Sequence, residues 1–89
     1  MEIYVGIDVA KETHWACALD ASARVLLDRA VNNDQAAIER LIADLRGLGG
    51  EVVVGLDITG SLARFLVAIL LAEGLRLVHV PGIAVNRAG

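Results

Sequence analysis

Two carboxylates, Asp8 and Asp57, each stand at the end of a stretch that is typical of a β-strand. Asp8 follows the alternating run "MEIYVGI", and Asp57 follows the apolar run "EVVVGL". Two like charges held close together repel each other, and a divalent cation between them offsets that repulsion. Mg²⁺ suits such a site because it prefers oxygen ligands and is usually held by one or two carboxylates plus substrate phosphate, and Mn²⁺ accepts similar ligands. In phosphodiester chemistry, two such ions activate the attacking oxygen and stabilise the leaving one.

Each carboxylate also has an ordinary structural explanation. A short strand can end in Asp by chance, and Asp57 could cap the helix expected after it, where the positive N-terminal end favours a negative charge. Other metal chemistry has little support, because no second histidine or cysteine stands at metal-ligand spacing. We expect His14 at a surface or edge, His79 packed in the fold and Cys17 as a buried thiol.

The elements that must position the two carboxylates follow from the pattern of apolar residues. Strands are predicted at residues 2–9, 13–19 and 24–31, and their short connections make an antiparallel meander. In the first strand, Ile3, Val5 and Ile7 share one face. Gly6 and Asp8 share the other, and the glycine leaves open space beside the carboxylate.

Two helices and two further strands complete the pattern. The first helix is predicted in "NNDQAAIERLIADLRGLGG", with Asn32 as its cap and an i,i+4 contact between Arg40 and Asp44. A buried strand over residues 51–57 precedes a second helix over 58–74, capped by Thr59 or Ser61, and a fifth strand over 75–80. The second helix is expected to bury Leu62, Phe65, Leu66, Ile69 and Leu70 and to extend its apolar surface through Val67 and Leu71.

This order of elements predicts an α/β fold of the ribonuclease H-like class, with two helices. Right-handed crossovers place the fourth strand parallel to the first, which gives a mixed five-stranded sheet of order 3-2-1-4-5 with strand 2 antiparallel. Ligands of open α/β sheets bind outside the carboxyl ends of the strands. Asp8 and Asp57 should therefore face each other at that edge.

Composition limits the classes of protein to which this chain can belong. Its 89 residues fit a single small domain, and its net charge of −3 argues that this chain alone does not hold nucleic acid tightly. The single cysteine suits a reducing cytoplasm, where we expect the protein to be located. No apolar run is long enough to span a membrane, and no signal peptide is apparent. With 56% hydrophobic residues, some apolar surface should be covered by a second copy or by further parts of a larger protein.

Several stretches resemble the N-terminal domain of the insertion-sequence transposases that have a DEDD-type, RuvC-like nuclease fold. They are "GIDVAKETHWACALD", the helix led by asparagine, "VVVGLDITGSL" and "GLRLVHVPGIAVNR", and together they cover essentially the whole chain. The resemblance implies a DNA transposase or recombinase that cleaves and transfers phosphodiester bonds with Mg²⁺. It implies DNA as a partner, with a guide RNA in similar recombinases.

The resemblance also implies roles for particular residues. The family's first acidic ligand matches Asp8, and the second, usually Glu, matches Asp57, whose side chain is one methylene shorter. Lys11, Thr59 and Gly60 are candidate phosphate contacts within the matching motifs. The family's third and fourth acidic residues and its serine-bearing domain lie downstream, so we expect residues 1–89 to be the N-terminal part of a RuvC-like domain that is inactive alone.

Two other functions compete with this interpretation. The first is nucleotide binding, since actin-like ATPases and sugar kinases share the strand order. Their first turn is normally rich in Gly, Ser or Thr so that the backbone can wrap a phosphate, whereas "DVAKETH" has no glycine. The chain could instead be a self-association module without chemistry, because the second helix is more apolar than one small sheet can cover.

Overall fold

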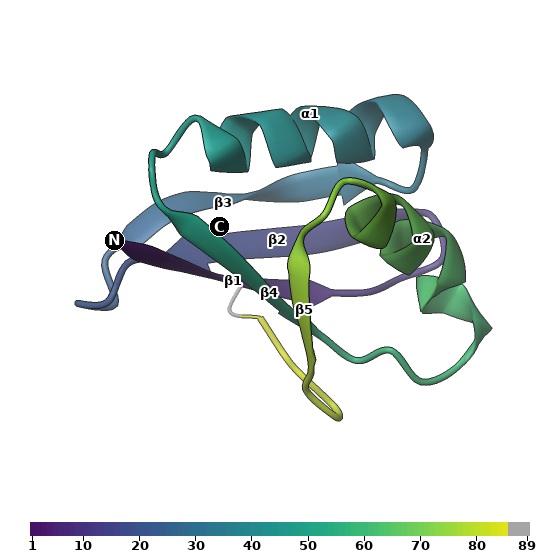
Figure 1. Ribbon diagram of the computed structural model, residues 1–89. Helices are drawn as coiled ribbons and strands as arrows, with labels where there is room; N and C mark the ends of the chain where they lie inside the picture. Colours follow the sequence, from purple (N-terminus) through teal and green to yellow (C-terminus); the bar gives the residue numbers. More distant parts are fainter. Residues whose placement is uncertain (86–89) are drawn as a thin grey trace.

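The computed structural model describes residues 1–85 as one mixed five-stranded sheet with two α-helices (Figure 1). The elements in chain order are β1 (Glu2–Asp8), β2 (Thr13–Leu19), β3 (Val25–Asn32), α1 (Gln35–Arg46), β4 (Glu51–Leu56), the short 3₁₀ helix η1 (Ser61–Ala63), α2 (Arg64–Ala72) and β5 (Arg76–His79). The strand order β3-β2-β1-β4-β5 confirms the predicted topology. As predicted, β2 runs antiparallel to its neighbours, whereas β1, β4 and β5 run parallel.

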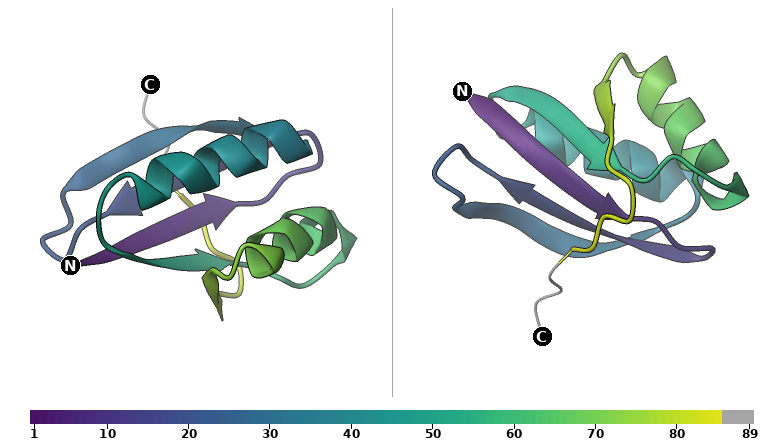
Figure 2. Two further views of the ribbon diagram at one scale, coloured as in Figure 1. Left: turned by 45° about the horizontal axis from the view of Figure 1, so that its top comes forward. Right: turned by 90° about the horizontal axis from the view of Figure 1, so that it is seen from below.

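Both helices cover the same face of the sheet, and residues 80–85 cross the opposite face (Figure 2). We call this opposite side the open face, and we call residues 80–85 the strap. The arrangement follows from the two crossovers, β3–α1–β4 and β4–α2–β5. Both are right-handed and both move along the sheet in the same direction, so both helices lie on the same face. Neither helix among the described residues has the length and apolar character needed to cross a bilayer.

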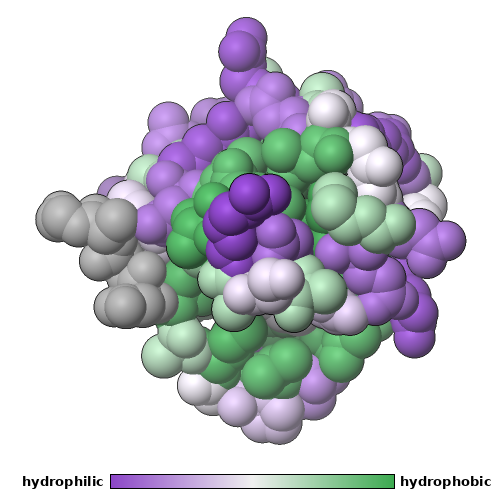
Figure 3. Space-filling view, turned by 90° about the vertical axis from the view of Figure 1, so that its left-hand side faces the viewer, coloured by the Kyte–Doolittle hydropathy of each residue, from purple (hydrophilic) through white to green (hydrophobic). Residues whose placement is uncertain are grey.

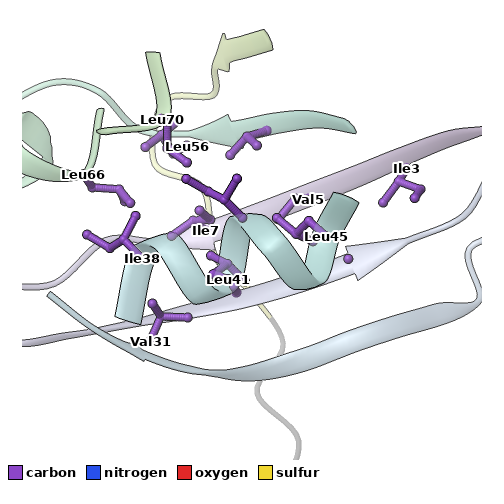
Figure 4. Packing of buried hydrophobic residues seen from close by; sticks show 14 residues of the cluster. Ile3, Val5, Ile7, Val31, Ile38, Leu41, Leu45, Leu56, Leu66 and Leu70 are labelled. Carbon is purple, nitrogen blue, oxygen red and sulfur yellow. The ribbon is translucent and has the colours of Figure 1, made fainter. Parts of the chain in front are cut away.

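The hydrophobic core fills the space between the helices and the sheet (Figure 4). Ile3, Val5 and Ile7 of β1 are at most 3% exposed, which confirms that this face of the strand points inward. Leu41 and Leu45 of α1 pack over them, while Leu66 and Leu70 of α2 are also fully buried. The buried core between the two layers is therefore built from aliphatic side chains.

The helix starts differ from those predicted. Asp34, and not Asn32, caps α1: its side chain accepts a hydrogen bond from the backbone N–H of Ala37. The helix therefore begins later, because Asn32 is still part of β3. Neither Thr59 nor Ser61 caps α2, which continues directly from η1 without a side-chain cap.

Three side chains have surroundings that differ from those predicted. His14 is buried at 1% exposure under the helices, so the expected surface or edge position was wrong. Cys17 is only half-buried and lies on the open face, where partial burial and the nearby Asp28 raise the pKa of its thiol. Asp44 pairs with Arg29 at 2.6 Å, and not with Arg40, because β3 lies beneath α1 and brings that arginine within reach.

The buried stripe of α2 is narrower than predicted. Leu62 and Phe65 are 51% and 46% exposed, whereas Val67 and Ile69 pack against the core. Leu62 precedes the α-helix in η1, and the change from 3₁₀ to α geometry shifts the face on which later residues fall.

Candidate cation site at the ends of β1 and β4

The register between β1 and β4 determines where the two carboxylates lie. Gly6 pairs with Gly55, and Ile7 pairs with Leu56, so Asp8 and Asp57 occupy the next positions on adjacent parallel strands. Each aspartate lies two residues beyond its glycine, and side chains alternate along a strand. The backbone thus brings Asp8 and Asp57 to the same edge of the sheet and to its open face. This placement is the one expected from the sequence.

Asp57 is held by hydrogen bonds to both of its carboxylate oxygens. Oδ1 accepts from the backbone N–H of Thr59, at 3.0 Å, and from the hydroxyl of the same residue. Oδ2 accepts from the backbone N–H of Gly82 at 2.9 Å. The bond from Asp57 to the amide two residues ahead is an Asx turn, which explains why "Asp-Ile-Thr-Gly" leaves β4 so sharply.

These bonds favour the charged form of the Asp57 carboxylate. They come first from the Thr59 hydroxyl and then from the Gly82 and Thr59 amides, and with the nearby His79 they lower its pKa to about 2. The side chain is still 31% exposed. Asp57 is therefore an ionised carboxylate at neutral pH that remains open to solvent.

Gly82 and His79 contact this site but were missed as site residues by the sequence analysis. His79 was expected to be packed, yet its Nδ1 accepts from the backbone N–H of Ile58 at 3.2 Å and lies 4.0 Å from Oδ1 of Asp57. The signal for Gly82 is the Pro-Gly pair after β5, which is typical of a tight turn. The position of His79 is a consequence of β5 lying next to β4, which places the strand ends together.

The turn after Asp8 is held by the buried His14. Its Nδ1 accepts from the backbone N–H of Ala10 at 3.0 Å, so Nε2 carries the proton that it donates to Oδ1 of Asn33 at 2.9 Å. The Asn33 amide group then donates to the backbone carbonyl of Lys11, and its backbone N–H donates to that of Glu12. The imidazole and Asn33 together fix the backbone of the turn that carries Lys11.

The three candidate phosphate contacts differ in what the structure shows of them. Lys11 is exposed in the turn after Asp8. Thr59 is exposed as well, but its hydroxyl donates to Asp57. Gly60 has φ +82° with open space around its Cα, a conformation that suits glycine. Lys11 lies in the turn after β1, whereas Thr59 and Gly60 lie in the turn after β4, and these are neighbouring strands.

Within residues 1–85, no group of three or more His, Cys, Asp or Glu side chains is arranged to hold a metal ion. The site therefore offers the two aspartates as its acidic ligands. Hard carboxylate oxygens at a partly exposed edge fit Mg²⁺ or Mn²⁺, which retain several waters and take further ligands from substrate phosphate. The donor chemistry fits such a cation, although two carboxylates make a sparse site.

Comparison with known proteins shows the family to which this chain belongs. A family model described as "Transposase", for the DEDD transposases of the IS110 type, matches residues 5–89. The chain belongs to this DEDD transposase family. It is 44% identical over 85 residues to the insertion element IS116 44.8 kDa protein of Streptomyces clavuligerus, which covers 96% of this chain and 21% of the relative. It is 38% identical over 88 residues to the IS900 42 kDa protein of Mycobacterium paratuberculosis, which covers 97% of this chain and 22% of that protein.

A solved structure shows the same fold as this DEDD transposase chain. Thermus thermophilus RuvC, in complex with a Holliday junction substrate, superposes with a TM-score of 0.60 at 15% identity. The match covers 92% of this chain and 66% of RuvC. At this identity the likeness shows the RuvC-like fold alone. The chain spans about a fifth of the length of its insertion-element relatives.

Proposed function

We propose that residues 1–89 form the N-terminal part of the RuvC-like domain of a transposase that cleaves and joins DNA with divalent cations. One observation carries the proposal: the β1–β4 register brings Asp8 and Asp57 to adjacent positions at one sheet edge. In the full-length protein, these two aspartates are catalytic ligands. Membership of the DEDD transposase family supports this assignment.

Mg²⁺ is the proposed ion, and Mn²⁺ is its substitute in experiments. When bound, the ion would supply a positive charge that stabilises the oxygens of a phosphodiester during transfer. Asp8 and Asp57 would hold it, and the hydrogen bonds from Thr59 and Gly82 keep Asp57 ionised for this purpose. Lys11 and Gly60 are proposed to approach the phosphate backbone from the two adjacent turns.

DNA is the proposed substrate of the full-length protein, and a guide RNA is a proposed further partner. The structure of the similar fold in RuvC is a complex with a Holliday junction, which supports a branched or joined DNA as the kind of ligand to test. The net charge of −3 requires basic surface elsewhere in the full-length protein. These partners are proposed for the whole transposase and not for this chain by itself.

Self-association is proposed as well, because α2 and its approach expose apolar side chains. Ile58, Leu62, Phe65 and Leu71 are 44%, 51%, 46% and 58% exposed. Light scattering should find dimers or larger species at high concentration and fewer of them in Phe65→Glu. A monomeric unaltered chain would contradict this part of the proposal.

The cation site is tested by titrating the chain with Mn²⁺ in a calorimeter. Asp8→Asn and Asp57→Asn should each weaken binding while the chain stays folded, because each removes one of two charged ligands. Glu39→Gln is the matched control, since it removes an exposed carboxylate from α1. Equal Mn²⁺ affinity in all four proteins would show that the two aspartates hold no cation.

A further inference from the structure

The strap is joined to the candidate site by a hydrogen bond from Gly82, and it meets the sheet at two places. The backbone N–H of Val80 donates to the carbonyl of Leu56 at 3.0 Å, and strap side chains lie over a pair of glycines. Gly82 donates its backbone N–H to Oδ2 of Asp57. Ile83 and Val85 lie over Gly6, and Val80 and Ile83 lie over Gly55. Because Gly6 and Gly55 are partners in the β1–β4 register, they form a slot two residues before the two aspartates.

The strap turns sharply at Pro81 and Gly82, and this turn explains why the Gly82 amide faces Asp57. Ile83 donates its N–H to the carbonyl of Val80 at 3.3 Å, which closes a four-residue β-turn. Gly82 occupies the third position with φ +64° after proline at the second, as in a type II turn. The turn itself bonds only its first and fourth residues, so the third amide is available to Asp57.

Side chains at the slot would interfere with the strap. A Cβ at Gly55 would come within 3.2 Å of Cγ2 of Val80, and a Cβ at Gly6 within 3.4 Å of Cδ1 of Ile83. The first distance is tighter than ordinary van der Waals contact, and a β-branched side chain would add methyl groups in the same space. Figure 3 shows apolar residues gathered across the middle and lower part of one side of the molecule.

We propose that the strap is a positioning element that holds the Asp57 carboxylate in one orientation through the Gly82 amide. Gly82, Ile83 and the slot glycines are then positioning residues that act on a cation through Asp57. This inference rests on the proposed function, because it assigns the strap to the same cation site. Docking of the strap in the slot fixes one rotamer of Asp57 before a cation arrives, so less side-chain freedom is lost on binding.

The test releases the strap without touching either aspartate. Ile83→Ser removes the apolar side chain from the slot, and Gly6→Val fills the slot from the side of the sheet. Ile83→Val is the conservative rescue, and Ala36→Ser is the control because it introduces the same serine at an exposed position of α1, on the opposite face of the sheet from the strap. Circular dichroism checks that each variant is folded.

Hydrogen exchange at the Gly82 amide and Mn²⁺ affinity are the two main measurements. In Ile83→Ser and Gly6→Val, exchange should be about two- to tenfold faster, as expected when one hydrogen bond is lost. Mn²⁺ affinity should fall by about two- to tenfold, which corresponds to the freedom of one side chain. Ile83→Val and Ala36→Ser should match the unaltered chain in both measurements.

Other outcomes would overturn the proposal. Unchanged exchange would show that the slot does not dock the strap, and faster exchange with equal or higher Mn²⁺ affinity would show that the strap does not position Asp57. Three-bond NMR couplings of Asp57 separate this failure from that of the proposed function. If the unaltered chain bound no Mn²⁺, the proposed cation site would fail. Couplings that show one Asp57 rotamer in the unaltered chain and averaged rotamers in Ile83→Ser would still support the positioning role of the strap. Equal couplings in the two proteins would overturn that role.

Discussion

The surroundings of Asp57 lower the pKa of its carboxyl group. The Thr59 hydroxyl and the two backbone amides stabilise its carboxylate, which lowers its pKa to about 2. An unfolded chain gives Asp its ordinary pKa of about 3.9. The charged form therefore stabilises the fold above about pH 4, and this stabilisation is lost as the pH falls from about 4 to about 2.

Thr59→Val should weaken this acid dependence, because the hydroxyl is the largest cause of the lowered pKa. The pKa of Asp57 should rise toward its ordinary value, and the free energy of unfolding should fall less steeply between about pH 4 and pH 2. Urea unfolding across this range measures the effect. Ser61→Ala, which removes a neighbouring exposed hydroxyl, is the control and should keep the original slope. An unchanged slope in Thr59→Val would contradict the assignment.

His14 is the residue whose role the sequence concealed most completely. A histidine on an alternating strand can face either side, and no local pattern shows that Ala10 and Asn33 will meet its two ring nitrogens. Those partners are brought together by the sheet and by the β3–α1 connection. Only the folded chain reveals that the imidazole is a buried bridge.

His14→Leu should destabilise the protein by about 1–3 kcal/mol, because it leaves the partly buried amide of Ala10 and side chain of Asn33 without their hydrogen bonds to the imidazole. The free energy of unfolding in urea is the quantity to measure. Thr13→Val, at the exposed neighbouring position, should change it by less than about 0.5 kcal/mol. An equally small change in His14→Leu would show that the bridge contributes little.

Among the elements, the strands were easier to predict than the helix starts. Alternation in β1 and the apolar run in β4 fixed both the strand positions and the edge at which Asp8 and Asp57 lie. Caps depend on where the preceding strand stops, and β3 continues through Asn32, so Asp34 caps α1. Single-residue shifts of this kind come from pairing across the sheet, which is not visible in a local pattern.

The face that α2 buries was misjudged for a related reason. The sequence pattern treats residues 58–74 as one helix, but η1 precedes α2 and the two have different numbers of residues per turn. Leu66 and Leu70 fall inside, while Leu62 and Phe65 do not. The sequence thus predicted the helix and its core-facing leucines but not the edges of its buried stripe.

Leu66→Ala should lower the free energy of unfolding by about 2–5 kcal/mol, because it opens a cavity between α2 and the sheet. Leu62→Ala, at a 51% exposed position, should cost less than about 1 kcal/mol. Chemical denaturation of both variants gives the comparison. Similar losses in the two would mean that α2 packs differently from the structure.

At the scale of the whole molecule, the chain forms a five-stranded sheet covered by helices, but the described residues offer only two aspartates at its candidate cation site. Both helices lie on one side of the sheet, and the strap crosses the other side, where Gly82 binds Asp57 (Figure 2). The sequence predicted the topology and the sheet edge that Asp8 and Asp57 share, because both follow from strand order. It did not reveal the strap, whose side chains lie over two glycines that are far apart in the sequence.

The 89-residue chain alone should neither nick nor join DNA. Two-metal catalysis needs enough ligands to fix both ions, and a misplacement of about 1 Å can cost around a hundredfold in rate. The net charge of −3 also opposes capture of a polyanion. Supercoiled plasmid incubated with the chain and Mn²⁺ should stay intact. Nicking that disappears in Asp8→Asn would show that two carboxylates suffice.

The most direct test of the central claim is to locate the cation itself. Crystals of the chain soaked in Mn²⁺ should give an anomalous peak between the carboxylates of Asp8 and Asp57, with oxygen ligands from both at about 2.0–2.2 Å. The peak should be lost from crystals of Asp57→Asn. An Mn²⁺ ion bound away from these two residues, with none between them, would contradict the shared site.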